Sequence, residues 1–244
     1  MTSEPVDRRV LGAVRYVDAP TGLPVADRLT VTAGGVSWIR NLHNYYAVAS
    51  TGELQAHAEA FDAPPATPPL ESVAFEVTVT DPGRHYLPRR HTIRLPRDAD
   101  PLHASETGSL FQSMDVALYP APSAAVRPGW AVVHATVTGA GPETRLAGAL
   151  IRVIRVSDDS RIAAGLSDGR GEALVAVPGI PVTTWGEDAG PVLTTEVEAR
   201  LEVVFDPASG PVPDPDDLEA RRNELRLKSS TVMLASGRAI TVRL

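Results

Sequence analysis

The segment Gly165-Leu-Ser-Asp-Gly169 has the residue types and spacing of a catalytic motif. It matches G-x-S-x-G, in which a sharp strand-to-helix turn presents a serine to a histidine base. Here β-type segments flank the motif on both sides, and no helical pattern follows Gly171. Glycine adopts positive φ without strain, and Asp168 can bond the backbone of its own turn, so the sequence favours a tight turn between strands. A serine hydrolase acting through Ser167 is kept as an alternative hypothesis.

Histidine side chains are the next candidates, because imidazole binds metal ions. The chain has six of them: His43, His57, His85, His91, His103 and His134. None forms the HxH, HxxxH or HExxH spacing that brings two imidazoles to one ion. We therefore predict no metal site and expect the histidines at the surface or at strand edges. His134 lies between apolar neighbours, so we expect it to be half-buried.

Two groups of carboxylates have the ligand type that calcium prefers. They are Asp214, Asp216, Asp217 and Glu219 in one group, and Asp158 with Asp159 in the other. The D-x-D-x-D-G loop pattern is absent, and acidic residues in the first turn of a helix explain the larger group. Cysteine is absent too, which excludes thiolate ligands, disulfides and a cysteine nucleophile. We predict no catalytic residue, no metal and no cofactor.

Residues 84–97 combine several arginines with Tyr86, and we select them as a partner-binding segment. Arginine and tyrosine are enriched at protein interfaces, and prolines at 88 and 96 keep the backbone extended. An edge strand protected by charge is the alternative explanation. The predicted partner-binding residues are Arg84, Tyr86, Arg89, Arg90 and Arg97.

Three tryptophans raise a further alternative. Exposed indole rings at Trp38, Trp130 and Trp185 could form a platform for carbohydrate. Tryptophans also serve as anchors in cores and interfaces. A carbohydrate- or peptide-binding module is therefore kept as a second function hypothesis.

The composition limits the partners that we expect. The chain has 244 residues, which suits one large β domain or two domains of about 100 to 150 residues each. The net charge is -7, and basic residues form no polycationic face, so we predict no binding to nucleic acid. No apolar run reaches the roughly 18 residues of a membrane span, and residues 1–15 lack a signal-peptide pattern. We expect a cytoplasmic protein without membrane insertion, which could be released within a particle.

Short apolar runs between turn residues predict strands at a spacing typical of a β-sandwich. In the first half we expect strands at residues 10–17, 29–32, 45–48, 72–80 and 91–95. A proline- and glycine-rich turn at 18–24 predicts that the first two form a hairpin. Residues 101–112 have little periodicity, so we expect a linker or domain edge there.

In the second half we expect strands at residues 114–119, 130–137, 150–156, 173–177, 192–205, 231–234 and 240–244. Residues 195–205 alternate apolar and charged side chains, which is typical of a half-buried antiparallel strand. Residues 213–225 begin acidic and continue basic, matching the dipole of a short helix.

One stretch of the second half combines strands and turns in a recognisable order. The segment Ala149-Leu-Ile-Arg-Val-Ile-Arg-Val156 precedes a polar turn at 158–161, the segment Gly165-Leu-Ser-Asp-Gly-Arg-Gly-Glu172 and a strand at 173–178. This order resembles the transthyretin-like or carboxypeptidase-regulatory-like family, in which such segments form half of a small β-sandwich. A more diverged copy, without the Ser-Asp-Gly-Arg-Gly turn, covers residues 13–18, 21–24, 29–32 and 44–48.

The resemblance implies a scaffold that packs against other proteins and has no catalytic role. We predict an all-β fold with two tandem antiparallel β-sandwich modules of transthyretin or immunoglobulin type, at residues 1–100 and 113–244, and one short helix near 214–225. Residues 81–97 also resemble accessory proteins of phage-tail-like contractile injection systems. The predicted function is therefore that of a non-enzymatic structural or adaptor subunit, with other protein subunits of an assembly as its partners.

Overall fold

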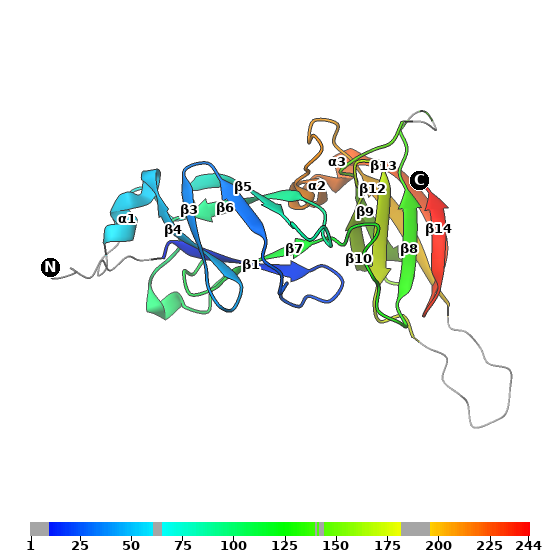
Figure 1. The fold of residues 1–244 in the computed structure, drawn as a ribbon, viewed down its shortest axis with the longest axis horizontal. Helices are drawn as coiled ribbons and strands as arrows, with labels where there is room; N and C mark the ends of the chain where they lie inside the picture. Colours follow the sequence, from blue (N-terminus) through cyan, green and yellow to red (C-terminus); the bar gives the residue numbers. More distant parts are fainter. Residues whose placement is uncertain (1–9, 61–64, 140, 142–143, 182–195) are drawn as a thin grey trace, which may run out of the picture. The chain divides into compact units, whose positions relative to one another are not determined.

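The computed structural model describes residues 10–60, 65–139, 141, 144–181 and 196–244, and most of their regular structure is β-strand (Figure 1). Four sheets account for the strands, and the predicted all-β class of sandwich modules is confirmed. The described residues form two compact units. The first contains 10–17, 24–82 and 90–117, and the second contains 18–23, 83–89 and 118–244, with the gaps given above.

The division into units differs from the predicted tandem arrangement, because neither unit is continuous in sequence. The predicted linker at 101–112 lies inside the first unit. Its backbone is fixed there by Arg97, whose Nε donates to the carbonyl of Ser109 at 3.0 Å and whose Nη2 donates to the carbonyl of Thr107. A lack of apolar periodicity in this segment therefore reflects an ordered loop held by polar contacts.

The first unit has two sheets. One has the order β3-β4-β1-β7 and the other the order β2-β5-β6. The strands are β1 (Gly12–Asp18), β2 (Thr30–Ala33), β3 (Val36–Arg40), β4 (Tyr45–Thr51), β5 (Val73–Thr80), β6 (Arg89–Leu95) and β7 (Met114–Leu118). The short helices are η1 (Gly52–Leu54), α1 (Gln55–Glu59) and η2 (Pro101–His103), which the sequence did not predict. Strand β7, predicted to open the second module, pairs with β1 instead.

The predicted hairpin between the first two strands is wrong. The turn itself forms, because the N–H of Asp18 donates to Leu23 and the N–H of Val25 donates to Tyr16, both at 2.9 Å. Strand β2 then pairs with β5, whereas β1 pairs with β4 and β7. The backbone pairing next to the turn includes a bridge between Val17 and Pro24 and extends no further than Val25, after which the chain joins the other sheet as β2.

The second unit is a sandwich with sheet orders β10-β9-β12-β13 and β11-β8-β14. Side chains from both sheets, among them Val133, Ile151, Val175 and Leu201, share one buried core. Strand β14 pairs with β8 in parallel, and the other recorded pairings in this unit are antiparallel. The strands are β8 (Ala131–Thr136), β9 (Leu150–Arg155), β10 (Arg161–Leu166), β11 (Glu172–Val177), β12 (Glu196–Val204), β13 (Arg226–Ala235) and β14 (Ala239–Arg243).

The helix predicted at 213–225 is present as α2 (Pro215–Ala220) and α3 (Arg222–Leu225). Asp214 caps it by accepting hydrogen bonds from the backbone N–H groups of Asp216 at 3.0 Å and Asp217 at 3.3 Å. This confirms that the acidic cluster marks a helix start. Leu218 is fully buried in a small apolar cluster that includes Leu150 of β9. Within the described ranges, no helix has the length and apolar content needed to cross a membrane.

The turn between β10 and β11 is built as the sequence predicts. Asp168 Oδ1 accepts hydrogen bonds from the backbone N–H groups of Arg170 at 2.8 Å and Glu172 at 3.0 Å. Gly171 has a φ of +72°, and a Cβ added there would lie 2.7 Å from the carbonyl oxygen of Val137. Glycine is needed at this position for both reasons.

Replacing Gly171 with alanine is expected to lower the free energy of unfolding by about 2–3 kcal/mol, because a left-handed backbone and a backbone clash act together. Gly169→Ala is the matched control, since nothing lies within 4 Å of its added Cβ and its φ is not positive. Equilibrium urea unfolding of the two variants compares them directly. Equal stability of both variants would contradict the assigned role of Gly171.

Candidate binding site

The outer face of the sheet formed by β9, β12 and β13 has a cluster of arginines and carboxylates. Along β12, Leu201 and Val203 point into the core, so Arg200 and Glu202 lie on the opposite face. In the pairing register, Glu202 is opposite Arg152 of β9 on one side and opposite Ser229 of β13 on the other. The predicted alternation of buried and more exposed side chains holds for residues 196–201, but Glu202 and Val204 on the outer face are buried as well. Residues 192–195 lie outside the described residues.

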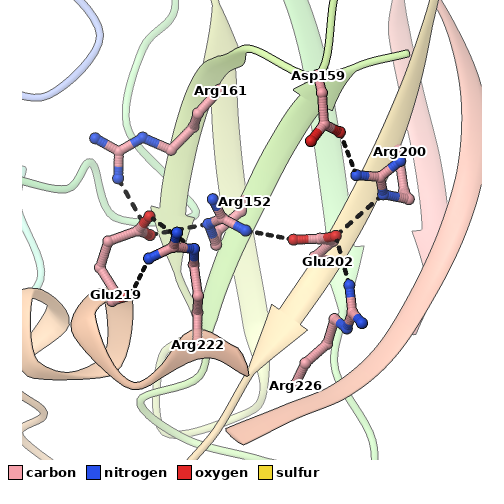
Figure 2. Close-up of polar contacts among 8 residues, drawn as sticks. All are labelled: Arg152, Asp159, Arg161, Arg200, Glu202, Glu219, Arg222 and Arg226. Atoms are coloured by element: carbon pink, nitrogen blue, oxygen red, sulfur yellow. Dashed lines mark hydrogen bonds and ion pairs between the residues drawn. The ribbon is translucent and has the colours of Figure 1, made fainter. Parts of the chain in front are cut away.

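Glu202 is the centre of the cluster and is only 3% exposed. Arg200 Nε donates to its carboxylate at 3.0 Å, Arg226 Nη1 donates at 3.1 Å, and Arg152 Nη1 forms a third ion pair (Figure 2). Burial acts to raise the pKa of Glu202, but the hydrogen bonds from Arg200 and Arg226 and the positive charges around it lower that pKa below its ordinary value. The carboxylate therefore stays ionised at neutral pH.

Glu219 of α2 is a second anchor for the same arginines. Arg152 Nε donates to it at 2.9 Å, so Arg152 bridges Glu219 and Glu202 (Figure 2). Arg161 Nη1 pairs with Glu219 at 3.2 Å. Arg222 has its Nε 4.0 Å from the Glu219 carboxylate and donates from Nη1 to the Glu219 carbonyl at 3.1 Å. Glu219 thus holds arginines from three elements, β9, β10 and α3.

A third carboxylate, Asp159 in the turn before β10, holds Arg200 through its Nη2 at 2.6 Å. The cluster then contains five arginines against three carboxylates: Arg152, Arg161, Arg200, Arg222 and Arg226 with Asp159, Glu202 and Glu219. All of these residues except Arg161 and Glu219 line a cleft of about 230 Å³, which we call the arginine cleft.

The arginine cleft has the chemistry of a binding site for anions. Guanidinium groups keep their charge at all physiological pH values and present planar forks of N–H donors to anionic oxygens. The carboxylates hold these groups in place before any ligand arrives, which lowers the entropy lost on binding. Because guanidinium stays protonated near neutral pH, the cleft favours binding over acid–base chemistry.

The predicted partner-binding residues are divided between the units and differ in exposure. Arg89 is fully buried, and Arg97 is 7% exposed and bound to carbonyls of its own loop. The burial of these two arginines corrects the expectation of an exposed segment. Arg84 is exposed, and Tyr86 and Arg90 are half-buried. Strand β6 is at the edge of its sheet, as the charge-protected edge explanation supposed. Partner binding by Arg84, Tyr86 and Arg90 stays a prediction.

Burial of Arg89 has a clear cause. It shares the inward face of β6 with His91, Ile93 and Leu95. Its guanidinium pairs with Asp216 and lies 3.6 Å from Asp214, at the start of α2. Burial raises the pKa of Asp214 above its ordinary value, although backbone hydrogen bonds and the charge of Arg89 act in the opposite direction.

Ser167, the candidate nucleophile, is 3% exposed. Its Oγ donates to the carbonyl of Leu146 at 2.6 Å and accepts from the N–H of Ala149 at 2.9 Å. Strands precede and follow the motif, as the sequence predicts. The hydroxyl therefore joins the turn to the segment before β9, which is a structural role.

The histidines are placed differently from one another. His57 and His91 are buried, which corrects the expectation of surface positions, although His91 lies in the edge strand β6. His134 is exposed rather than half-buried. His91 Nε2 lies 3.0 Å from the hydroxyl of Tyr16. His57 Nδ1 has no hydrogen-bond partner among the described residues and lines a cavity of about 10 Å³, room for one water. The described residues hold no cluster of three or more potential metal ligands.

The tryptophans of the described structure belong to different units. Trp38 belongs to the first unit and Trp130 to the second, and both are half-buried. The guanidinium of Arg127 lies over the Trp130 ring at 5.6 Å. Trp185 lies outside the described residues.

Comparison with known proteins gives little similarity. No family model matches the chain, and no curated protein matches it. Among solved structures, the Bacillus anthracis TIE protein is similar with 11% identity and a TM-score of 0.29, over 96% of this chain and 33% of that chain. A crystal structure of the shaft pilin spaA from Lactobacillus rhamnosus GG matches with 10% identity and a TM-score of 0.26, over 95% and 96% of the two chains. The chain spans about a third of the length of the TIE protein. At these scores the likeness carries no argument about function.

Proposed function

We propose that this chain is a non-enzymatic structural or adaptor subunit of a larger protein assembly and that the arginine cleft is a contact point for a partner. One observation supports this: five arginines are fixed by three carboxylates, and the two most exposed arginines that line the cleft, Arg222 and Arg226, have side chains that are 41% and 55% exposed. Preorganised arginines at a protein surface are typical of residues that dominate interface affinity.

A contractile injection system or phage-tail-like particle is the assembly that we propose. The support is the sequence resemblance of residues 81–97, together with the order of strands and turns at 149–178, which the second unit builds as β9, a polar turn, β10, the Ser167–Gly171 turn and β11. The carboxypeptidase-regulatory-like resemblance suggests the same kind of scaffold role.

The proposal predicts a fixed stoichiometry with other proteins. Native purification from a gently lysed source, followed by size-exclusion chromatography and mass spectrometry of the co-eluting chains, is expected to give a complex much larger than the 25.9 kDa chain. Recovery only as a free monomer at native concentration would contradict the proposal. The genes next to this one supply an independent check, because sheath and tube subunits are expected among them.

A further inference from the structure

The two most exposed arginines that line the cleft, Arg222 and Arg226, keep hydrogen-bond donors that no described residue uses. Arg226 donates from Nη1 to Glu202, which leaves its Nε and Nη2 without a partner in the described part of the chain. Arg222 donates from Nη1 to the carbonyl of Glu219, and its Nη2 has no partner there either. The two residues are four positions apart, at the start of α3 and the start of β13, and both line the cleft. An anionic oxygen group between them would accept from both forks.

The charges of the cleft indicate how much negative charge it takes. Five arginines face three carboxylates, so two positive charges are left without a counter-charge inside the cluster. A single carboxylate would neutralise half of this excess, whereas a dianion would neutralise all of it. Charge-assisted hydrogen bonds to a dianion are also stronger than those between neutral groups.

The size and lining of the cleft indicate a compact ligand. Its volume of about 230 Å³ is below the roughly 300–1,000 Å³ of ordinary small-molecule pockets. The lining is charged apart from Asn223 and Ile154, and Ile154 is 2% exposed, so the cleft offers almost no apolar surface to an organic body. These limits suit a tetrahedral oxyanion with several oxygens close together.

We infer that the arginine cleft binds a doubly charged phosphate group, either free or attached to a protein partner, between Arg222 and Arg226. This inference rests on the proposed function only because both place the contact with a partner at the arginine cleft. The binding itself requires neither an assembly nor a second chain.

The test is a calorimetric titration of the full chain with inorganic phosphate at pH 7.5 and low salt, with chloride and acetate as anion controls. We expect saturable binding to phosphate that weakens as salt rises, and an affinity at least about tenfold lower in the double variant Arg222→Gln with Arg226→Gln. Arg238→Gln is the matched control, because Arg238 is 62% exposed on the same unit and lies outside the cleft. It is expected to bind phosphate like the unmodified chain.

Two results would overturn the inference: no saturable phosphate binding, or equal affinity in the double variant when its circular dichroism spectrum is unchanged. Acetate binding as tight as phosphate binding would also overturn it. A phosphoserine peptide that binds more tightly than inorganic phosphate would assign the phosphate to a protein partner, and equal affinities would assign it to free phosphate. If the double variant loses its partner but the unmodified chain binds no phosphate, the ligand class is wrong and the proposed function stands.

Discussion

Glu202→Gln is expected to lower the free energy of unfolding by about 3 kcal/mol at pH 7, the largest effect of any single change in the arginine cleft. The substitution keeps the size of the side chain but removes the charge that Arg152, Arg200 and Arg226 share. Arg152 is 11% exposed and cannot turn fully to solvent, so its repulsion from the other arginines is retained. Equilibrium urea unfolding monitored by circular dichroism measures the difference.

The same variant should lose part of the acid sensitivity of the fold. The pKa of Glu202 is lowered in the folded state, so its contribution to stability is present above the unfolded-state value near 4.5 and is lost as pH falls below it. The stability difference between the unmodified chain and Glu202→Gln should therefore shrink between about pH 5 and pH 3. Glu198→Gln, at an exposed position of the same strand, is the control and should change stability by less than about 0.5 kcal/mol. A pH-independent difference would argue against the ionised Glu202 at the centre of the cleft.

Arg89→Met is expected to cost about 3 kcal/mol. Methionine fills much of the buried space, but it leaves the carboxylates of Asp214 and Asp216 without the guanidinium that pairs with them. Arg90→Met, at the next position of β6, is the matched control. Arg90 pairs with Glu76 at 2.8 Å, and their side chains are 30% and 62% exposed, so its loss should cost less than about 1 kcal/mol.

The effect of Arg89→Met should also depend on pH. Burial already raises the pKa of Asp214, and loss of the Arg89 charge should raise it further. When the pKa of a carboxyl is raised in the folded state, its protonation at lower pH removes the cost of the unpaired charge. The difference in free energy of unfolding between Arg89→Met and the unmodified chain should therefore become smaller as pH falls from 7 towards 4. A cost as small as that of Arg90→Met at pH 7 would show that the Arg89 pair does not hold α2 in place.

Local patterns predicted most of the strands, although β3 was not among those expected, whereas pairing between strands depended on distant residues. Strand β5 was predicted closely because Phe75, Val77 and Val79 alternate with more exposed side chains and are buried. The turn before β2 did not predict which strand β2 pairs with, because packing of the whole unit decides between β1 and β5. Helix α1 was missed because it is five residues long and its N-cap, Leu54, makes no side-chain cap.

The arginine cleft was visible in the sequence only in part. The alternation of Arg200 and Glu202 with apolar residues predicted a polar face on that strand. The contact of Glu202 with Arg152 follows from the pairing of β12 with β9, and its contact with Arg226 follows from the pairing of β12 with β13. The sequence specifies neither pairing. Burial of Arg89 had a detectable signal, because His91, Ile93 and Leu95 follow it at every second position and a period of two places all four on one face.

The role of the arginine cleft in assembly is tested most directly by native co-purification of the unmodified chain beside the double variant Arg222→Gln with Arg226→Gln. Both are expressed at native level, and Arg238→Gln serves as the control. The account predicts that the unmodified chain and the control elute with their partners at fixed stoichiometry, while the folded double variant elutes alone. Co-elution of the double variant with the same partners at the same stoichiometry would contradict it.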